Sequence, residues 1–382
     1  MLCTGNSIAL FIAGRILQGT SAAVVWTVGL ALLADTVGQK DAGQAMGYVG
    51  LAMSLGILVG PLLGGIVFAR AGYYAVFGMA FGLIGLDIVL RFALIEKRAA
   101  LKWLGRDGTD CSISHSPNTE HTNQILDRKR QDTGSAQNEV RNSPAQIPDT
   151  AQSLRHRLPP MITLLGSRRL LAGLWACLVQ ASLLTAFDAV LPLFVRHTFG
   201  WSSIGAGLIF LAVVIPTFIS PIIGWLSDRH GPRWYAAAGF VFTAPFLILL
   251  RFVTHNSLNQ KVLLCALLVL IGFGDTLVFA PITAEITYVV EAKESRKPGS
   301  FGKNGAMAQA YGLFNMAWAA GCLVGPIWGG MVNETAGWGT MAWTLGLLSF
   351  VTAIPTVIWT GGSITKPARR HTAAIESDTL SC

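Results

Sequence analysis

Charged residues are scarce in this chain of 382 residues. Aspartate, glutamate, lysine and arginine make up 13% of it, about half the usual share, while apolar types make up 52%. This balance excludes a soluble fold with a polar coat. The net charge of +8 could indicate nucleic-acid binding, but the basic residues lie in the connections between apolar runs. That distribution favours membrane topology over a nucleic-acid partner.

The sequence also lacks the arrangements that carry catalytic chemistry. Its six cysteines are scattered and give neither a metal spacing nor a disulfide framework. Its seven histidines form no metal or triad pattern, and no glycine-rich loop of the phosphate-binding type follows a strand. We therefore expect neither an enzyme nor an ATP-driven pump, and we expect no metal or cofactor.

Long hydrophobic runs are what the sequence has instead. Runs of roughly 20 residues recur, the length that crosses the hydrocarbon core of a bilayer as a helix. Residues 99–165 and 363–382 are polar and predict a disordered linker and a tail, which the basic residues place in the cytosol. The apolar runs predict an all-α membrane protein with nine spanning helices, over residues 8–32, 43–69, 73–95, 169–196, 202–227, 234–254, 262–290, 305–332 and 338–361.

One segment of the chain occurs twice. Gln44 to Gly72 contains QAMGYVGLAMSLGILVGPLLGG, and Gln309 to Gly337 contains QAYGLFNMAWAAGCLVGPIWGG, with matched pairs at an offset of 265. A repeat this distant predicts duplicated membrane halves, here a partial first half over residues 1–98 and a six-helix second half over residues 166–362. The offset calls for roughly 100 residues before Met1. We therefore expect a twelve-helix protein without its first three helices.

Three motifs stand out in these helices, each with an alternative interpretation. Arg15-Ile-Leu-Gln18-Gly19 places an arginine in an apolar run, where it either faces a cavity or snorkels at a helix end. A repeated Gly-x-Leu-Val-Gly-Pro-x-x-Gly-Gly motif allows close helix contact and bending, or serves packing alone. A Gly-x-x-x-Asp-Arg-x-Gly-x-Arg motif marks a gate, or an ordinary basic turn. The second motif comprises Gly56, Gly60, Pro61, Gly64, Gly65, Gly321, Gly325, Pro326, Gly329 and Gly330, and the third comprises Gly224, Asp228, Arg229, Gly231 and Arg233.

Through these motifs the chain resembles the transporters of the major facilitator superfamily. It is most similar to the drug:proton antiporter branch, including vesicular monoamine transporters and fungal multidrug or metabolite exporters. The resemblance covers nearly everything except the linker and the tail, and it implies two pseudo-repeated six-helix halves. It also implies that the repeated glycine motif is associated with antiport. The third motif would then hold the two halves shut on the cytosolic side through charge-assisted bonds.

Three carboxylates lie inside apolar runs, where a buried charge is expensive. Asp188 precedes Leu-Pro, at a place similar to that of an acidic residue in the monoamine transporters. Asp275 and Glu285 are ten residues apart, about 1000° of helix rotation, so they point to different faces. The resemblance implies that their helices line the cavity. We expect these three, with Arg15 and Gln18, to lie on the substrate or proton pathway; a structural role is the alternative for Asp275 and Glu285.

The sequence therefore predicts a secondary transporter that exports a small amphipathic or cationic organic compound by proton-coupled antiport and alternating access. An uncoupled facilitator, or an inactive fragment that serves as a membrane interaction subunit, are the alternatives. The expected partners are the small molecule, protons and the lipid bilayer, and the chain is expected to act as a monomer. We expect it in the plasma membrane or in a vacuolar or vesicular membrane. Asn333, in the only Asn-x-Thr sequon, is a predicted glycosylation site on the outer side.

Overall fold

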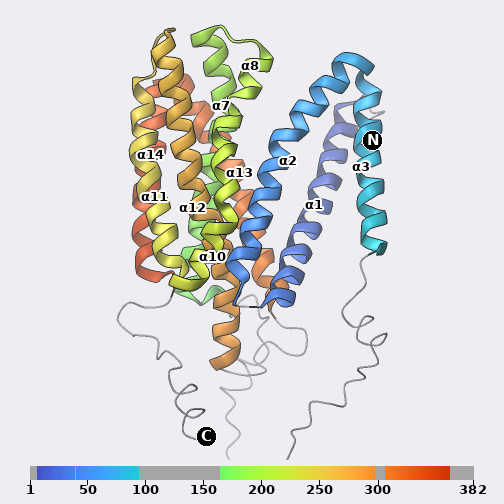
Figure 1. Cartoon of the computed structure of the whole chain (residues 1–382), viewed down its shortest axis with the longest axis vertical. Coiled ribbons are helices and arrows are strands. Elements are labelled where there is room, and N and C mark those ends of the chain that lie inside the picture. Colours follow the sequence, from blue (N-terminus) through green and yellow to red (C-terminus); the bar gives the residue numbers. More distant parts are fainter. Residues whose placement is uncertain (1–6, 39, 94–163, 297–305, 362–382) are drawn as a thin grey trace, which may run out of the picture. The chain divides into compact units, whose positions relative to one another are not determined.

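A computed structural model shows a helical protein (Figure 1). It describes residues 7–38, 40–93, 164–296 and 306–361, so nearly all of the predicted linker and the whole predicted tail lie outside the described residues. Helices and short connections make up the described part, with no strand in those four ranges. This confirms the predicted all-α class. The chain divides into two compact units, one formed by Met1–Arg70 with Leu154–Cys382 and the other by Ala71–Ser153.

The helices follow the apolar runs of the sequence. Helices satisfy their own backbone hydrogen bonds, which is the requirement for crossing lipid. The apolar helical segments number eight in the described residues, and the last of them, residues 307–359, contains two helices divided at Gly337, where φ is +82°. The helices are α1 (Ile8–Val37), α2 (Ala42–Ala71), α3 (Tyr73–Ala93), α7 (Arg168–Phe199), α10 (Ser220–His230), α11 (Pro232–Leu249), α12 (Leu258–Arg296), α13 (Met307–Ala336) and α14 (Trp338–Trp359).

The predicted helix over residues 202–227 is broken. It consists of α8 (Ser203–Leu208), α9 (Phe210–Val214), the 3₁₀ turn η2 (Ile215–Ile219) and then α10. Pro216 lies in η2 and Pro221 lies in the first turn of α10. Because proline has no backbone N–H and clashes with the preceding turn, the helix tightens into a 3₁₀ turn there.

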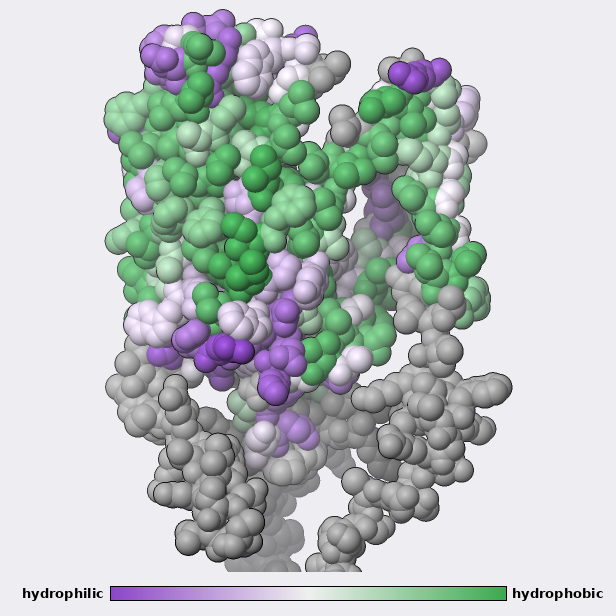
Figure 2. Space-filling view, viewed as in Figure 1, coloured by the Kyte–Doolittle hydropathy of each residue, from purple (hydrophilic) through white to green (hydrophobic). Residues whose placement is uncertain are grey.

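Small residues set the packing of the helices that follow residue 168. A Cβ atom on Gly325 of α13 would lie 3.0 Å from the Cα atom of Ser182 on α7, and one on Gly346 of α14 would lie 2.7 Å from the Ile248 side chain on α11. Glycine therefore allows these helix pairs to approach closely. Figure 2 shows the outer face of this bundle covered by hydrophobic residues, with hydrophilic residues at its ends. A bilayer accommodates such a surface.

The repeat is visible as a contact between equivalent residues. Met46 on α2 and Tyr311 on α13 are 265 positions apart, and the hydroxyl of Tyr311 lies 3.9 Å from the sulfur of Met46. Two equivalent positions of a duplicated unit meet only near the axis that relates the copies. The two glycine motifs nevertheless differ in their surroundings. Gly321 and Gly325 pack against α7, whereas a Cβ atom on Gly56 or Gly60 would meet no described atom of another element within 4 Å.

Candidate functional site

A central cavity between α2 and the C-terminal helices contains two of the predicted carboxylates. Asp188 of α7 and Asp275 of α12 both line it. The Nε2 group of Gln180 donates to Oδ1 of Asp275 over 3.0 Å and to the Asp275 backbone oxygen over 3.3 Å. The rest of the lining is mostly apolar and rich in aromatic rings, contributed by Phe187, Phe210, Phe240, Phe279 and Trp318.

Helical spacing explains why these side chains share the cavity. On α7, Gln180, Leu184, Phe187 and Asp188 follow the spacing of one helix face. On α12, Leu268, Ile271, Asp275, Val278 and Phe279 do the same. Glu285 continues the same helix but does not line the cavity. Asp275 and Glu285 thus lie on different faces, as the rotation between them requires.

A second cluster lies at the end of the helices that the sequence places in the cytosol, which we call the cytosolic end. The carboxylate of Asp228 accepts hydrogen bonds from the backbone N–H groups of Gly43 over 2.7 Å and Gln44 over 2.9 Å, at the start of α2. The hydroxyl of Tyr288 also donates to Asp228. A Cβ atom on Gly47 would lie 2.6 Å from the Ser220 carbonyl oxygen, so α2 and α10 are in close contact. Asp228 therefore attaches the N-terminus of α2 to the C-terminal helices.

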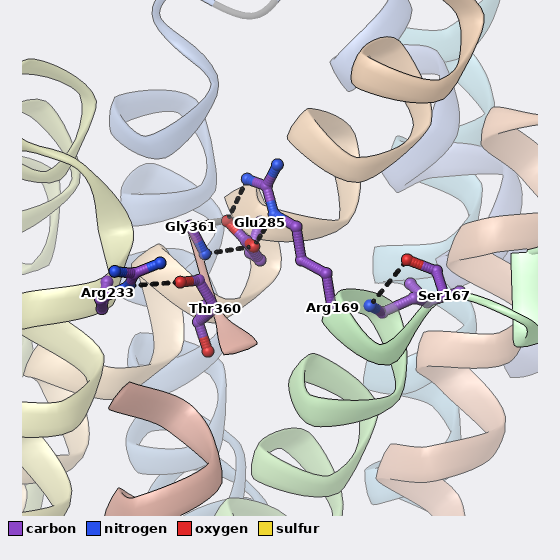
Figure 3. Close-up of polar contacts among 7 residues, drawn as sticks. Ser167, Arg169, Arg233, Glu285, Thr360 and Gly361 are labelled. Carbon is purple, nitrogen blue, oxygen red and sulfur yellow. Dashed lines mark hydrogen bonds and ion pairs between the residues drawn. The ribbon is translucent and has the colours of Figure 1, made fainter. Parts of the chain in front are cut away.

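A third cluster surrounds Glu285 at the same end (Figure 3). Its carboxylate is fully buried and forms a bidentate ion pair with Arg169, in which the Nη2–Oε2 distance is 2.9 Å. The backbone N–H of Gly361 donates to Glu285 over 2.7 Å. Nearby, Nε of Arg233 donates to the carbonyl oxygen of Thr360 over 2.5 Å. These bonds connect the start of α7 and the end of α14 to α12, and the start of α11 to the end of α14.

Other predicted residues lie apart from these clusters. Arg15 is exposed on α1, and its Nη1 donates to Oε1 of Gln18 over 3.1 Å; neither residue lines the central cavity. The guanidinium of Arg229 lies 4.0 Å from the centroid of the Trp225 ring. Asn333 is in the last turn of α13, where its carbonyl accepts from Gly337.

The remaining residues of the two motifs differ in their contacts. Gly329 also contacts α7, whereas a Cβ atom on Gly64, Gly65 or Gly330 would meet no described atom of another element within 4 Å. Gly224 contacts α2 at Gly43, and Gly231 has φ at +92° before α11. Pro326 lies inside α13, whereas the side chain of Pro61 is outside the described residues.

The sequence interpretation missed several partners of the predicted residues. Gln180 lies eight residues before Asp188 and Tyr288 lies three after Glu285, so helical spacing from a recognised carboxylate could have found both. Arg169 and Gly361 carried no such signal, because their role depends on contacts with Glu285 over 116 and 76 positions of sequence.

Apolar helices long enough to span a bilayer, packed around an internal cavity with carboxylates, define a multi-pass membrane protein of the transporter class. The family model of the Major Facilitator Superfamily matches residues 1–296 and 185–379. The chain therefore belongs to the major facilitator superfamily, and the predicted family and transport class are confirmed.

Relatives and a solved structure agree with this assignment. The chain is 30% identical over 380 residues to the MFS-type transporter ppzB of Metarhizium rileyi, covering 93% of this chain and 76% of the relative. It is 32% identical over 351 residues to the uncharacterized MFS-type transporter C18.02 of Schizosaccharomyces pombe, covering 92% and 74%. The crystal structure of the human organic anion transporter MFSD10 (TETRAN) has a TM-score of 0.57 and 19% identity, covering 93% of this chain and 72% of that chain. That likeness shows the fold.

Proposed function

We propose that this transporter exports a small amphipathic organic cation in exchange for protons, by alternating access. The observation that carries the proposal is the pair of carboxylates, Asp188 and Asp275, in one cavity whose remaining lining is mostly apolar and aromatic. Carboxylates attract a cation, and aromatic faces bind organic cations through cation–π contact and apolar burial. Carboxylates held in a partly dehydrated cavity can also exchange protons near neutral pH.

We infer different roles for the carboxylates that the sequence analysis assigned together to the substrate or proton pathway. Asp275 lines the cavity and has a neutral hydrogen-bond partner in Gln180, so it is available to a proton or a cation. Glu285 is fully buried and already has the guanidinium of Arg169 as its counter-ion. We therefore assign proton exchange to Asp188 and Asp275, and we assign to Glu285 a structural part at the cytosolic end of the C-terminal half.

Alternating access requires the cytosolic end to open and close. The bonds from Asp228 to the start of α2 join the two repeated halves, and they must break for the cavity to open to the cytosol. The bonds of Glu285 stay within the C-terminal half and stiffen it. Competition between a proton and the cation for the cavity carboxylates would then couple occupancy to this opening.

The test uses the full chain in proteoliposomes with an imposed pH gradient and ethidium as the probe cation. We expect an acidic interior to drive ethidium accumulation. Asp188→Asn and Asp275→Asn should each remove the response to the gradient, because an amide does not titrate. Glu334→Gln is the matched control. Glu334 is an exposed acidic residue in the last turn of α13 that does not line the central cavity, so this variant should keep the response. Ethidium uptake that ignores the gradient would contradict coupling and support a facilitator.

A further inference from the structure

A second recess opens at the cytosolic end, and its lining is polar and basic, unlike that of the central cavity. It lies beside the turn between α10 and α11, with contributions from the start of α7, from α12 and from the connection between α1 and α2. Its lining includes the basic residues Lys40, Arg169 and Arg233, the acidic residue Asp228, and Ser227 and Trp234. The closing contacts of the cytosolic end leave several hydrogen-bond donors at this recess unused.

The first of these donors is the hydroxyl of Ser227. Ser227 lines the recess, its side chain is 0% exposed, and its oxygen has no hydrogen-bond partner among the described residues. A buried hydroxyl without a partner is costly, and native proteins retain few of them. This hydroxyl is therefore a donor without a described partner at the wall of the recess.

The second set of donors is the N-terminus of α11, a helix of 18 residues. Gly231 precedes it at φ +92° and supplies no side-chain cap, and Pro232 begins the helix. The first-turn N–H groups of a helix have no partner within the helix, and the helix dipole makes this end positive. Residues 231–234 line the recess, so this anion-attracting end faces the same space as Ser227.

The charges around the recess favour an anion. Nε of Arg233 donates to the carbonyl oxygen of Thr360, and its guanidinium also interacts electrostatically with the carboxylate of Glu285 and the guanidinium of Arg169. Lys40 is exposed and makes no ion pair with a described residue. The two carboxylates at this end already have partners. Asp228 and Glu285 each accept three hydrogen bonds, which occupy most of the acceptor positions of each carboxylate.

We propose that this recess binds a phosphate group, either as inorganic phosphate or as the headgroup of an anionic lipid. The Ser227 hydroxyl and the first-turn amides of α11 donate to its oxygens, while Arg233 and Lys40 neutralise its charge. Trp234 is 64% exposed beside the recess, and tryptophan at a membrane interface suits contact with a lipid.

Occupancy of the recess would act on the transport cycle. Lys40 belongs to the connection that precedes α2, whereas Arg233 and Ser227 belong to the C-terminal half. A phosphate held by both would therefore stabilise the closed cytosolic end and slow transport. Any ligand that binds only the folded, closed form also raises the thermal stability of the protein.

The test measures the melting temperature of the full chain in nanodiscs, in two arms. One arm adds inorganic phosphate to nanodiscs of uncharged lipid, and the other uses nanodiscs with phosphatidylinositol 4-phosphate and no free phosphate. Ser227→Ala removes only a hydroxyl that makes no bond, so its melting temperature without ligand should equal that of the parent. Lys40→Gln removes one exposed charge. Lys261→Gln, at the opposite end of the bundle beside Phe199, is the matched control.

We expect a stabilising shift in at least one arm, and the arm that responds identifies the source of the phosphate. Affinity should fall about fivefold in Ser227→Ala and about tenfold in Lys40→Gln, the losses expected for one neutral and one charge-assisted hydrogen bond. The control should bind like the parent. The absence of a shift in both arms, or a shift that the two variants leave unchanged, would overturn the proposal. Because the readout is binding and not transport, it does not depend on the proposed antiport.

Discussion

Replacing Asp228 by asparagine should open the cytosolic end. The asparagine side chain could keep one acceptor oxygen, but its amide nitrogen would face an N–H of Gly43 or Gln44, or the hydroxyl of Tyr288, where the carboxylate oxygens now accept. At least one charge-assisted hydrogen bond is lost, at a cost of about 1.5–3 kcal/mol. Loss of the negative charge at the start of α2 adds about 0.3–1 kcal/mol.

These terms together favour opening by about 2–4 kcal/mol, which shifts the ratio of open to closed molecules by about 30- to 1000-fold. Electron paramagnetic resonance can measure that ratio through the distance between two spin labels. Thr36 near the end of α1 and Ser295 near the end of α12 are exposed and lie at the ends of helices from different halves. The labels would be attached to cysteines at these positions after the six native cysteines are replaced by serine.

The parent should give one short distance, and Asp228→Asn should give a longer one as a major population. Asp41→Asn is the matched control, because Asp41 is an exposed carboxylate next to the same helix end without a hydrogen bond from its side chain to another described residue. Its distance distribution should stay close to that of the parent. If Asp228→Asn and Asp41→Asn give the same distribution, Asp228 does not hold the end closed and the reasoning fails.

Two further predictions concern stability, measured as thermal unfolding in detergent. Glu285→Gln should destabilise the fold by about 3–5 kcal/mol, because it leaves the guanidinium of Arg169 without its counter-ion; an unchanged melting temperature would refute this role. Gly325→Ala should lower the free energy of unfolding by about 1–3 kcal/mol, because the added methyl group forces α13 away from Ser182. Gly60 is the equivalent residue 265 positions earlier, and Gly60→Ala should change the free energy of unfolding by less than about 1 kcal/mol. Equal effects of the two glycine substitutions would show that the copies pack alike.

Most of the helices could be predicted from the sequence, because a bilayer leaves few alternatives to long apolar helices. The exception is instructive. The helix changes locally to a 3₁₀ turn at Pro216, within a run of apolar residues. Hydropathy does not predict such a change, because apolar residues lie on both sides of the turn. Pro326, inside a comparable run, leaves α13 continuous, so the presence of proline alone does not locate a break.

The candidate site was predictable only where its residues share a helix. Periodicity places Gln180 near Asp188 and separates Asp275 from Glu285, since both relations depend on rotation about one axis. The contact of Asp228 with Gly43 was not predictable in the same way, because it joins segments 185 positions apart and depends on how α2 packs against α10. The repeat identified which residues of the two glycine motifs are equivalent, but it did not predict which of the two motifs packs against another helix.

The central claim is that a cation and protons compete for the carboxylates of the cavity. Isothermal titration of the purified chain with ethidium, in buffers of different ionisation enthalpy, measures the protons released on binding without requiring transport. We expect proton release at neutral pH in the parent and less release in both Asp188→Asn and Asp275→Asn, whereas Glu334→Gln should release as many protons as the parent. Binding of ethidium without proton release, or release that both asparagine variants retain, would contradict this claim.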